Sequence, residues 1–303
     1  MLAREPERLE QAATEVRDAG GEALVVPVDV ADAEAVEKAA ERAEQSFGSI
    51  DIWVNCAMVA VFSPVHEMTA EEIRRVTEVT YLGTVHGTLS ALRRMRRRGA
   101  GTIVQVGSAL SYRAIPLQSA YCVAKFAIRG FTDALRTELL HENSDIHVTM
   151  VQLSAFNTPQ FDWARYRTRQ QPQPVPPIFQ PELAARGIVW AARHRRRELC
   201  VGFPAVKAIV LNKFFPGVAD RYLSKTAFSG QRDADRPAQP ENERQDNLFR
   251  PVKGSFGSHG RFDAKARRHS WQLVANFYRA PLLAATTLLL LALITMIVQA
   301  MTG

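Results

Sequence analysis

Short apolar runs alternate with amphipathic stretches along the first half of the chain. Apolar runs rich in β-branched residues occupy 23–28, 50–54 and 102–106, and each is bounded by polar residues or glycine. Such runs predict buried strands. Between the runs, 5–19 and 32–47 carry apolar residues at the spacing of one helix face, which predicts two helices. The chain therefore begins as an alternation of strands and helices.

The same alternation continues to about residue 225. A capping-box pattern from Thr69 to Glu72 predicts the start of a helix that reaches residue 98, with a bend near Gly83 or Gly87. Further patterns predict a helix from about Ser119, strands at 147–153 and 198–201, and helices at 181–193 and 205–225, the last broken at Pro216-Gly217. Repeated units of this kind indicate a parallel sheet between helices. We predict an α/β fold: a Rossmann-like, doubly wound parallel sheet in three α/β/α layers.

Beyond residue 225 the composition changes. Polar residues, Pro and Gly dominate 226–262, which predicts a flexible linker with little to bury, and 263–280 is a basic segment of helical character. Residues 281–301 are apolar and long enough for a transmembrane helix. We therefore predict a domain at 1–225, a linker, a basic juxtamembrane helix and a membrane anchor.

The residues around the apolar segment indicate its orientation. Arg267, Arg268 and Arg279 precede it, and basic flanks lie on the cytoplasmic side of a membrane. We therefore predict a single-pass membrane protein whose folded domain faces the cytoplasm. A buried helix that packs on a partner or on a second copy is the alternative.

The composition excludes some classes of function. The 303 residues carry a formal charge of +7, and much of the positive charge lies in clusters at 93–98 and 193–197, near predicted helix ends. Cations at helix ends are typical of solvated surface, so we predict no nucleic-acid binding. The three cysteines, Cys56, Cys122 and Cys200, have no metal-binding spacing, and we predict no metal site.

The central stretch, 101–139, carries the candidate chemistry. Ser108 follows the apolar run at 102–106, and Tyr121 and Lys125 lie four residues apart in the predicted helix. That spacing places the two side chains on one helix face. A neighbouring ammonium favours the phenolate, so we expect a lowered tyrosine pKa. With a serine hydroxyl on the same oxygen, these residues predict proton transfer in carbonyl or alcohol chemistry.

This combination resembles the short-chain dehydrogenase/reductase family, and the resemblance covers residues 1 to about 225. It implies that Ser108 holds the substrate oxygen, that Tyr121 is the general acid/base, and that Lys125 binds the nicotinamide ribose and lowers the tyrosine pKa. Thr80 stands where the family has the asparagine of its proton relay. The resemblance therefore implies a catalytic set of Ser108, Tyr121, Lys125 and Thr80.

The resemblance also implies cofactor-binding residues. Arg4 lies where the family's second strand ends and matches a basic residue that often pairs with the adenosine 2′-phosphate, so NADP is the expected cofactor, with NAD possible. The others it implies are Asp29 and Val30 at the adenine, Asn55 and Ala57 in the family's Asn-Asn-Ala-Gly turn, Tyr121 and Lys125, and Thr158 at the nicotinamide.

One family feature is absent from the sequence. The family's first strand and its Thr-Gly-x-x-x-Gly-x-Gly turn, which holds the pyrophosphate, do not occur. We therefore expect that a βα unit before Met1 is missing and that the sheet lacks its first strand. A non-catalytic membrane-bound fragment or scaffold is the first alternative function. A nucleotide-sugar epimerase or dehydratase is the second, although 160–225 is short for its substrate domain.

The loop at 160–181 occupies the place of the family's substrate lid. Its aromatic residues either form an apolar substrate pocket or only anchor the loop: Phe161, Trp163, Tyr166 and Phe179. We expect a small, hydrophobic carbonyl or alcohol substrate and, from the family, homo-oligomers. The substrate itself and the direction of reaction are not indicated.

Overall fold

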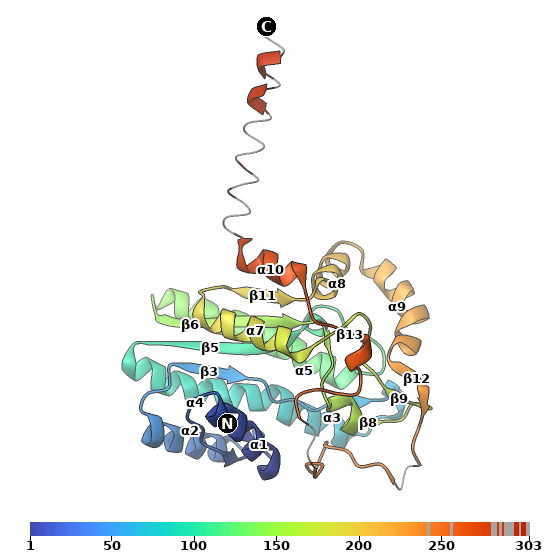
Figure 1. Cartoon of the computed structure of the whole chain (residues 1–303), viewed down its shortest axis with the longest axis horizontal. Helices are drawn as coiled ribbons and strands as arrows, with labels where there is room; N and C mark the ends of the chain where they lie inside the picture. Colours follow the sequence, from blue (N-terminus) through green and yellow to red (C-terminus); the bar gives the residue numbers. More distant parts are fainter. Residues whose placement is uncertain are drawn as a thin grey trace.

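The largest sheet of the molecule has four parallel strands. The computed structural model describes residues 1–240, 243–254 and 257–279, together with 284, 287, 294–296 and 298–300. The strands lie in the order β11 (Glu198–Val201), β6 (Asp145–Leu153), β5 (Ala100–Ser108) and β3 (Ile52–Asn55) (Figure 1). All three pairings are parallel, which confirms the predicted parallel α/β architecture.

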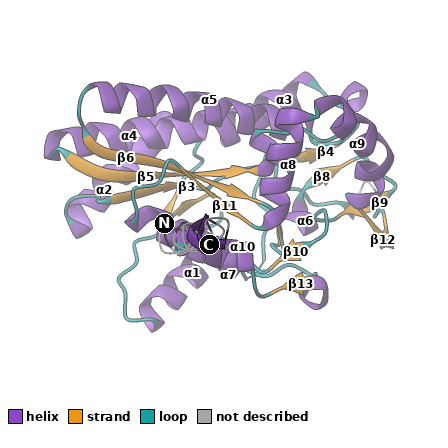
Figure 2. Cartoon of the chain, turned by 90° about the horizontal axis from the view of Figure 1, so that it is seen from above, coloured by secondary structure: helices purple, strands orange, loops and turns teal. Residues whose placement is uncertain are grey.

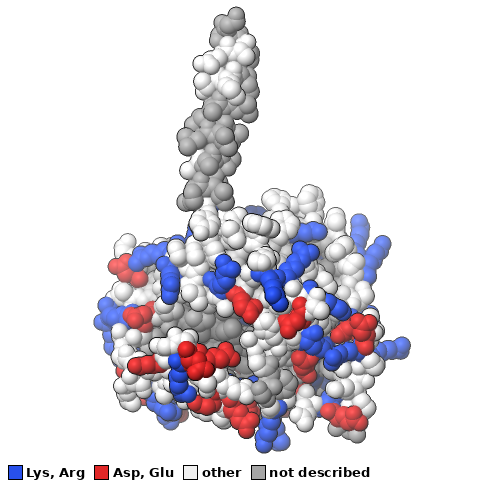
Figure 3. All heavy atoms as spheres, viewed as in Figure 1, with Lys and Arg blue, Asp and Glu red and all other residues white. Residues whose placement is uncertain are grey.

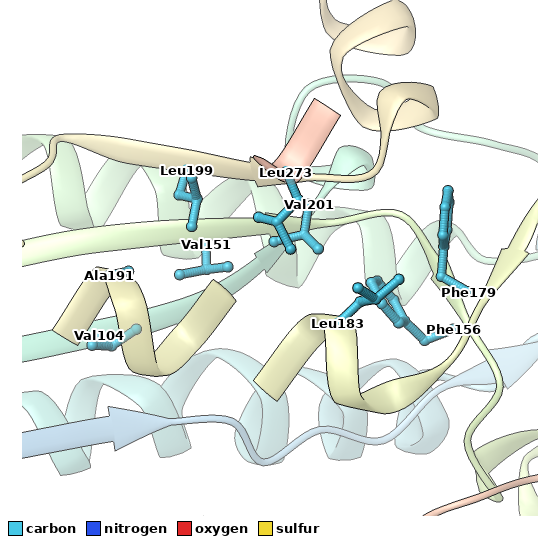
Figure 4. Close-up of a cluster of buried hydrophobic side chains, with 9 residues drawn as sticks. All are labelled: Val104, Val151, Phe156, Phe179, Leu183, Ala191, Leu199, Val201 and Leu273. Carbon is cyan, nitrogen blue, oxygen red and sulfur yellow. The ribbon is translucent and has the colours of Figure 1, made fainter. Parts of the chain in front are cut away.

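Helices cover both faces of this sheet (Figure 2). One face carries α2 (Ala33–Phe47), α4 (Gly83–Arg98) and α5 (Ser119–His141), and the other carries α1 (Pro6–Asp18), α7 (Pro181–Arg193) and α10 (Trp271–Phe277). On the face that carries α7 and α10, side chains of these two helices pack against the sheet in an apolar cluster (Figure 4). Burial of such branched and aromatic side chains from water is the main term that holds the layers together.

The N-terminal strands form a separate small sheet. Strand β1 (Leu2–Ala3) pairs in parallel with β2 (Val26–Pro27), and no pairing joins β1 to β3 among the described strands. On β3, Ile52 and Val54 are 44% and 42% exposed, although a parallel sheet normally buries both faces. The expectation of a further strand in this region stays a prediction.

The long helix predicted from Thr69 is interrupted. The capping box is present at the start of α3 (Ala70–Val76), and a π-helical segment, Thr77–Leu82, joins α3 to α4. Gly83 follows at once, where an added Cβ would lie 2.5 Å from Cγ2 of Val30. The bend predicted near Gly83 is therefore present as a π-helical turn, a feature that is frequent at functional sites.

Short elements complete the domain. Helices α8 (Phe203–Phe214) and α9 (Pro216–Gly230) replace the single helix predicted at 205–225, and the break lies at Pro216, as predicted. The remaining elements are α6 (Gln160–Trp163), β4 (Val61–Phe62), β7 (Ala155–Phe156), β8 (Arg165–Tyr166), β9 (Gln170–Pro172), β10 (Ile178–Phe179), β12 (Arg232–Pro237) and β13 (Ala266–Arg267), with 3-10 turns at Val65–Glu67, Ala109–Ser111 and Asp263–Lys265.

The segment predicted as a flexible linker packs against the domain where it is described. Strand β12 pairs with β9, and Leu248 and Phe262 are 0% and 3% exposed. This prediction was wrong for those residues, because a few widely spaced apolar side chains each find a preformed apolar site. The predicted basic helix at 263–280 is also shorter than expected, since α10 begins only at Trp271.

A search of the described residues finds no helix that is both long and apolar enough to cross a bilayer. Most of the predicted transmembrane segment, 281–301, lies outside the described residues. The membrane anchor therefore stays a prediction.

Candidate active site

Ser108 and Tyr121 are brought together at the carboxyl end of the sheet. Ser108 is the last residue of β5, and Tyr121 lies in the first turn of α5. A side-chain hydrogen bond links the two residues. The Ser108 hydroxyl oxygen also accepts a bond from the Leu110 amide at 3.1 Å, which fixes its direction. A small carbonyl group placed here would therefore meet both hydroxyls.

Lys125 lies one turn further along the same helix face. Its Nζ is 5.5 Å from the Tyr121 ring centroid and donates a hydrogen bond to the Val106 carbonyl at 2.6 Å. The lysine is 2% exposed, and this burial lowers its pKa to about 8. The amine is thus held by the strand that also carries Ser108.

The tyrosine does not have the lowered pKa that the sequence predicts. Burial raises the pKa of Tyr121 well above its ordinary value, and the hydrogen bond with Ser108 offsets only part of this effect. The prediction was wrong because the phenol is enclosed by apolar side chains while Lys125 directs a hydrogen bond to Val106. Tyr121 therefore stays in its neutral phenol form at neutral pH.

Thr80, the fourth predicted catalytic residue, lies in the π-helical segment and is fully buried. Its hydroxyl accepts a bond from the Val59 amide and donates one to the Val59 carbonyl, both at 3.1 Å. These two bonds tie the segment to the loop that follows β3. Thr80 therefore positions that loop, and a role in a proton relay stays a prediction.

Four of the predicted cofactor residues line one cleft of about 400 Å³. Arg4 follows β1, Asp29 and Val30 follow β2, and Ala57 follows β3. All four lie beyond the carboxyl ends of parallel strands, which is where ligands bind in folds of this class. Burial opposes ionisation of Asp29, but the hydrogen bond and charge of Arg75 outweigh it and lower the Asp29 pKa.

Asn55 does not share this cleft. Its amide nitrogen donates to Thr88 Oγ1 at 3.0 Å and to Gln105 Oε1 at 2.9 Å, and its oxygen accepts from Trp53 Nε1 at 2.8 Å. The side chain is thus committed to a polar network between β3, β5 and α4. Asn55 supports the end of β3, and the structure gives it no place in the cleft wall.

A C-terminal segment that sequence reasoning missed crosses the cleft. We call residues 246–252 the strap. Arg4 donates to the carbonyls of Asn247 and Leu248, and Nε of Arg75 donates to the Leu248 carbonyl at 3.1 Å. Asn247 and Pro251 line the same cleft as Arg4. The arginine expected to face an adenosine phosphate therefore holds backbone oxygens of the strap.

The strap is fixed on both sides. Leu248 is fully buried in a cluster with Val59 and Val79, and the Asn247 amide donates to the Trp163 carbonyl at 3.0 Å. Asp246 pairs with Arg165 at 2.8 Å. Arg165 in turn contacts Glu72, whose carboxylate is 1% exposed. The strap thereby links the cleft to the loop at 160–181.

Thr158 is covered by another part of the C-terminal region. An added Cβ on Gly260 would lie 2.6 Å from the Thr158 carbonyl, so the two backbones touch. Beside it, the buried Asn157 amide donates to Gln180 and to Asp263 at 3.0 and 2.8 Å, and its oxygen accepts from the Phe262 amide. Asn157 directly follows the two-residue strand β7, and a polar residue at a strand end is the signal that could have indicated it.

The aromatic residues of the loop divide between two roles. Phe161 and Tyr166 pack in an apolar cluster that Tyr121 and Met58 border, whereas Phe179 packs in the core between α7 and the sheet. Phe262 closes the first cluster against Phe161 with a ring-centroid distance of 6.1 Å. The apolar side of the candidate site is thus built partly by the C-terminal segment. Among the described residues, no group of His, Cys, Asp and Glu side chains fits a metal ion.

Comparison with known proteins agrees with this geometry. Residues 1–167 match the family model described as short chain dehydrogenase. The "Uncharacterized oxidoreductase YxnA" of Bacillus subtilis (strain 168) is 34% identical over 243 residues, which cover 80% of this chain and 68% of that protein. The crystal structure of a short-chain dehydrogenase from Streptomyces avermitilis has a TM-score of 0.60 at 24% identity, and the match covers 75% of this chain and 88% of that one.

A further solved structure is similar over a smaller part of the chain. L-sorbose reductase from Gluconobacter frateurii, complexed with NADPH and L-sorbose, has a TM-score of 0.50 at 29% identity, over 53% of this chain and 60% of that one. The family model spans more than half of the chain, and its range includes Ser108, Tyr121 and Lys125. The chain therefore belongs to the short-chain dehydrogenase family, a family of NAD(P)-dependent oxidoreductases.

Proposed function

We propose that this protein transfers a hydride between a nicotinamide cofactor and the carbon of a carbonyl or alcohol group, with Tyr121 as the proton donor or acceptor. The observation that carries the proposal is the meeting of Ser108, Tyr121 and Lys125 at the end of β5. The bound nicotinamide supplies or accepts the hydride. The residues of the chain hold the substrate oxygen and move its proton.

Each residue of the set has a separate task. The Ser108 hydroxyl is fixed by Leu110 and directs a substrate oxygen toward Tyr121. Tyr121 is neutral at neutral pH because burial raises its pKa, so it donates a proton to a carbonyl oxygen that is gaining negative charge. Lys125 lies behind the ring and stabilises the phenolate that remains.

The cleft fits the adenosine end of a dinucleotide. Arg4 offers charged donors, Asp29 offers an acceptor, and Val30 and Ala57 offer apolar contact on one wall. Arg4 supports NADP as the preferred form, and the similar L-sorbose reductase was solved with NADPH. The contacts between Arg4 and the strap must open before a 2′-phosphate reaches that side chain. Lys125 and Thr158 would hold the nicotinamide end.

A binding and turnover experiment tests this function. We expect the full chain to bind NADPH, measured by cofactor fluorescence, and to oxidise it in the presence of apolar ketones or aldehydes. Tyr121→Phe should lower turnover by at least about 100-fold and leave NADPH binding nearly unchanged, because only the proton donor is lost. Tyr81→Phe is the matched control, since Tyr81 lies in the π-helical segment and outside the set. Full turnover by Tyr121→Phe would refute the assignment.

A scaffold without catalysis is the second candidate function. It is favoured by the strap, which lies in the cleft and occupies Arg4. The same NADPH titration separates the two functions. A wild-type chain that does not bind NADPH at all would leave the scaffold as the better explanation.

The C-terminal segment supports a membrane-bound form of the enzyme. Residues 280–303 contain no Asp, Glu, Lys or Arg, and Arg267, Arg268 and Arg279 precede them. We infer a single-pass anchor that leaves the domain on the cytoplasmic side and suits a hydrophobic substrate. After expression in cells, the full chain should stay in the membrane pellet in alkaline carbonate, and release into the supernatant would contradict the anchor.

Homo-oligomer formation belongs to the same proposal. Val123 and Phe126 on α5 are 63% and 39% exposed, which leaves apolar surface on the helix that carries Tyr121. Sedimentation of the detergent-solubilised chain would measure the oligomeric state.

A further inference from the structure

Helices α8 and α9 are arranged with their large apolar side chains outward. Helix α8 buries only the small Ala205, whereas Phe203 and Phe214 are 61% and 65% exposed. Helix α9 likewise buries Ala219 and Ala227 and exposes larger residues. The exposed apolar residues of the two helices and their junction are Phe203, Val210, Phe214, Phe215, Val218, Tyr222 and Phe228. A surface helix of a water-soluble domain normally shows the opposite arrangement.

Helix α10 adds to the same surface. Leu273 anchors this helix in the core, while Trp271 is 86% exposed and Tyr278, just beyond its end, is 61% exposed. Figure 1 shows α8 and α10 at the same end of the domain, where the chain leaves the body. We call the exposed apolar residues of α8, α9 and α10 the outer face. Exposed patches of this extent mark sites of interaction with another molecule or with lipid.

The charges around the outer face are positive. Residues 203–230 contain Lys207, Lys213, Arg221 and Lys225 but only one acidic residue, Asp220. Residues 268–279, which contain α10, include Arg268 and Arg279 and no acidic residue. Figure 3 shows a largely uncharged surface at the upper end of the folded domain, bordered by both cationic and anionic side chains. Aromatic residues bordered by lysine and arginine are the composition of helices that lie in the interface of anionic membranes.

We propose that the outer face lies in the headgroup region of an anionic bilayer and holds the domain flat against the membrane. The uncharged run at 280–303 begins directly after α10, so the part of the chain that the proposed function places in the bilayer leaves from this face. This inference rests on the membrane-bound form proposed above, and it adds a second contact of the folded domain itself. Trp271 and Tyr278 take the place that aromatic residues hold at membrane interfaces.

The contact also gives a route for an apolar substrate. A cavity of about 540 Å³ lies between α9 and the loop after Ser108, and Tyr112, Pro116, Leu223 and Phe228 help to line it. Phe228 belongs to the outer face as well. A substrate dissolved in the bilayer would therefore enter beside the residues that follow Ser108.

Hydrogen exchange of the full chain tests the proposal. The chain is reconstituted in phosphatidylglycerol vesicles, in phosphatidylcholine vesicles and in detergent, and amide exchange is followed by mass spectrometry. We expect several-fold slower exchange at 203–230 and 271–278 in phosphatidylglycerol than in either other medium, while α2 exchanges equally in all three. Failure of the chain to float with vesicles would refute the anchor. Flotation with equal exchange at 203–230 in all three media would refute only the outer face as a lipid contact.

Variants make the test more specific and address the alternative that a second copy of the chain covers the outer face. Phe214→Ser should remove most of the added protection at 203–230, and Phe47→Ser, which changes another exposed phenylalanine, on α2, should leave that protection intact. If protection instead appears in detergent and grows with protein concentration, a second copy of the chain covers the face and the lipid proposal is wrong. Equal loss of protection in both variants would also refute the lipid proposal.

Discussion

Lys125 is both buried and positively charged, and burial of a charge costs free energy. It is 2% exposed, its pKa is lowered to about 8, and its hydrogen-bond partner is an uncharged carbonyl. A buried cation of this kind destabilises the fold, so its presence suggests a functional role. Its position behind Tyr121 supplies that role. The residue therefore belongs to the chemistry of the site more than to the packing of α5.

The pH dependence of stability follows from this burial. The folded-state pKa lies below the ordinary value of 10.5, so between about pH 8 and 10 the unfolded chain holds more protons at this residue than the folded chain. The contribution of Lys125 to stability therefore rises with pH across that window. Urea unfolding should show wild type gaining stability relative to Lys125→Met from pH 8 to 10, and a constant difference between the two would contradict the lowered pKa.

Glu72 is also a buried charge, but unlike Lys125 it has oppositely charged partners. Its carboxylate caps α3 through Thr69 and pairs with Arg165 and Arg167, the latter at 2.7 Å. Burial opposes ionisation, but the bonds from Arg167, Thr69 and Arg165 outweigh it and lower the pKa of Glu72 to about 2. The residue thus joins α3 to the loop that covers the site.

Lowering the pH should weaken the contacts of Glu72 with Arg165 and Arg167 over a defined pH range. Because the folded-state pKa is lowered, Glu72 contributes stability that is present above about pH 4.5 and is lost as pH falls toward 2. Glu72→Gln should be less stable than wild type at pH 7, and the difference should shrink as pH falls from 4.5 to 2. Unfolding by urea along a pH series measures this, and a gap independent of pH would disprove the role of the charge.

At the scale of elements, the strap has the largest consequence for function. It has no regular secondary structure, yet Leu248 is fully buried and three arginines, Arg4, Arg8 and Arg75, donate to its carbonyls. Burial of one leucine side chain stabilises such a segment by about 2 kcal/mol. Because Arg4 donates to the carbonyls of Asn247 and Leu248, the strap and a cofactor phosphate are expected to compete for Arg4.

Weakening the strap should therefore strengthen cofactor binding. Leu248→Ala removes the buried anchor, so we expect faster amide exchange at 246–252 and tighter NADPH binding in a fluorescence titration. Phe249→Ala is the control, because the neighbouring Phe249 is partly exposed and lies outside the buried cluster. Weaker NADPH binding by Leu248→Ala would mean that the strap is a wall of the cofactor site and not its competitor.

At the scale of the whole molecule, the chain has a layered domain with chemistry at one edge and an apolar outer face at another. The sheet positions Ser108, and α5 brings Tyr121 and Lys125 to it from one side. Helices α8 and α9 follow β11 and carry much of the outer face, and α9 borders the cavity beside the loop after Ser108. The membrane contact that we propose therefore lies next to that loop.

The sequence by itself determined the alternation of strands and helices, the capping box at Thr69 and the pairing of Tyr121 with Lys125. These features depend on local spacing, because a helix places residues four apart on one face and a buried strand needs a run of apolar residues. The break at Pro216 was predictable for the same reason, since proline cannot continue a helix interior. Ser108 was found because it directly follows such a run.

Only the tertiary structure decided how buried each group is and what the C-terminal region contacts. The pKa of Tyr121 depends on the side chains that enclose it, which come from distant parts of the chain. Asn55 has the expected place in the sequence, but its bonds to Thr88 and Gln105 point it away from the cleft. The strap and the outer face have no local signature either, because a scattered leucine or an outward phenylalanine acquires its role only from the surfaces that surround it.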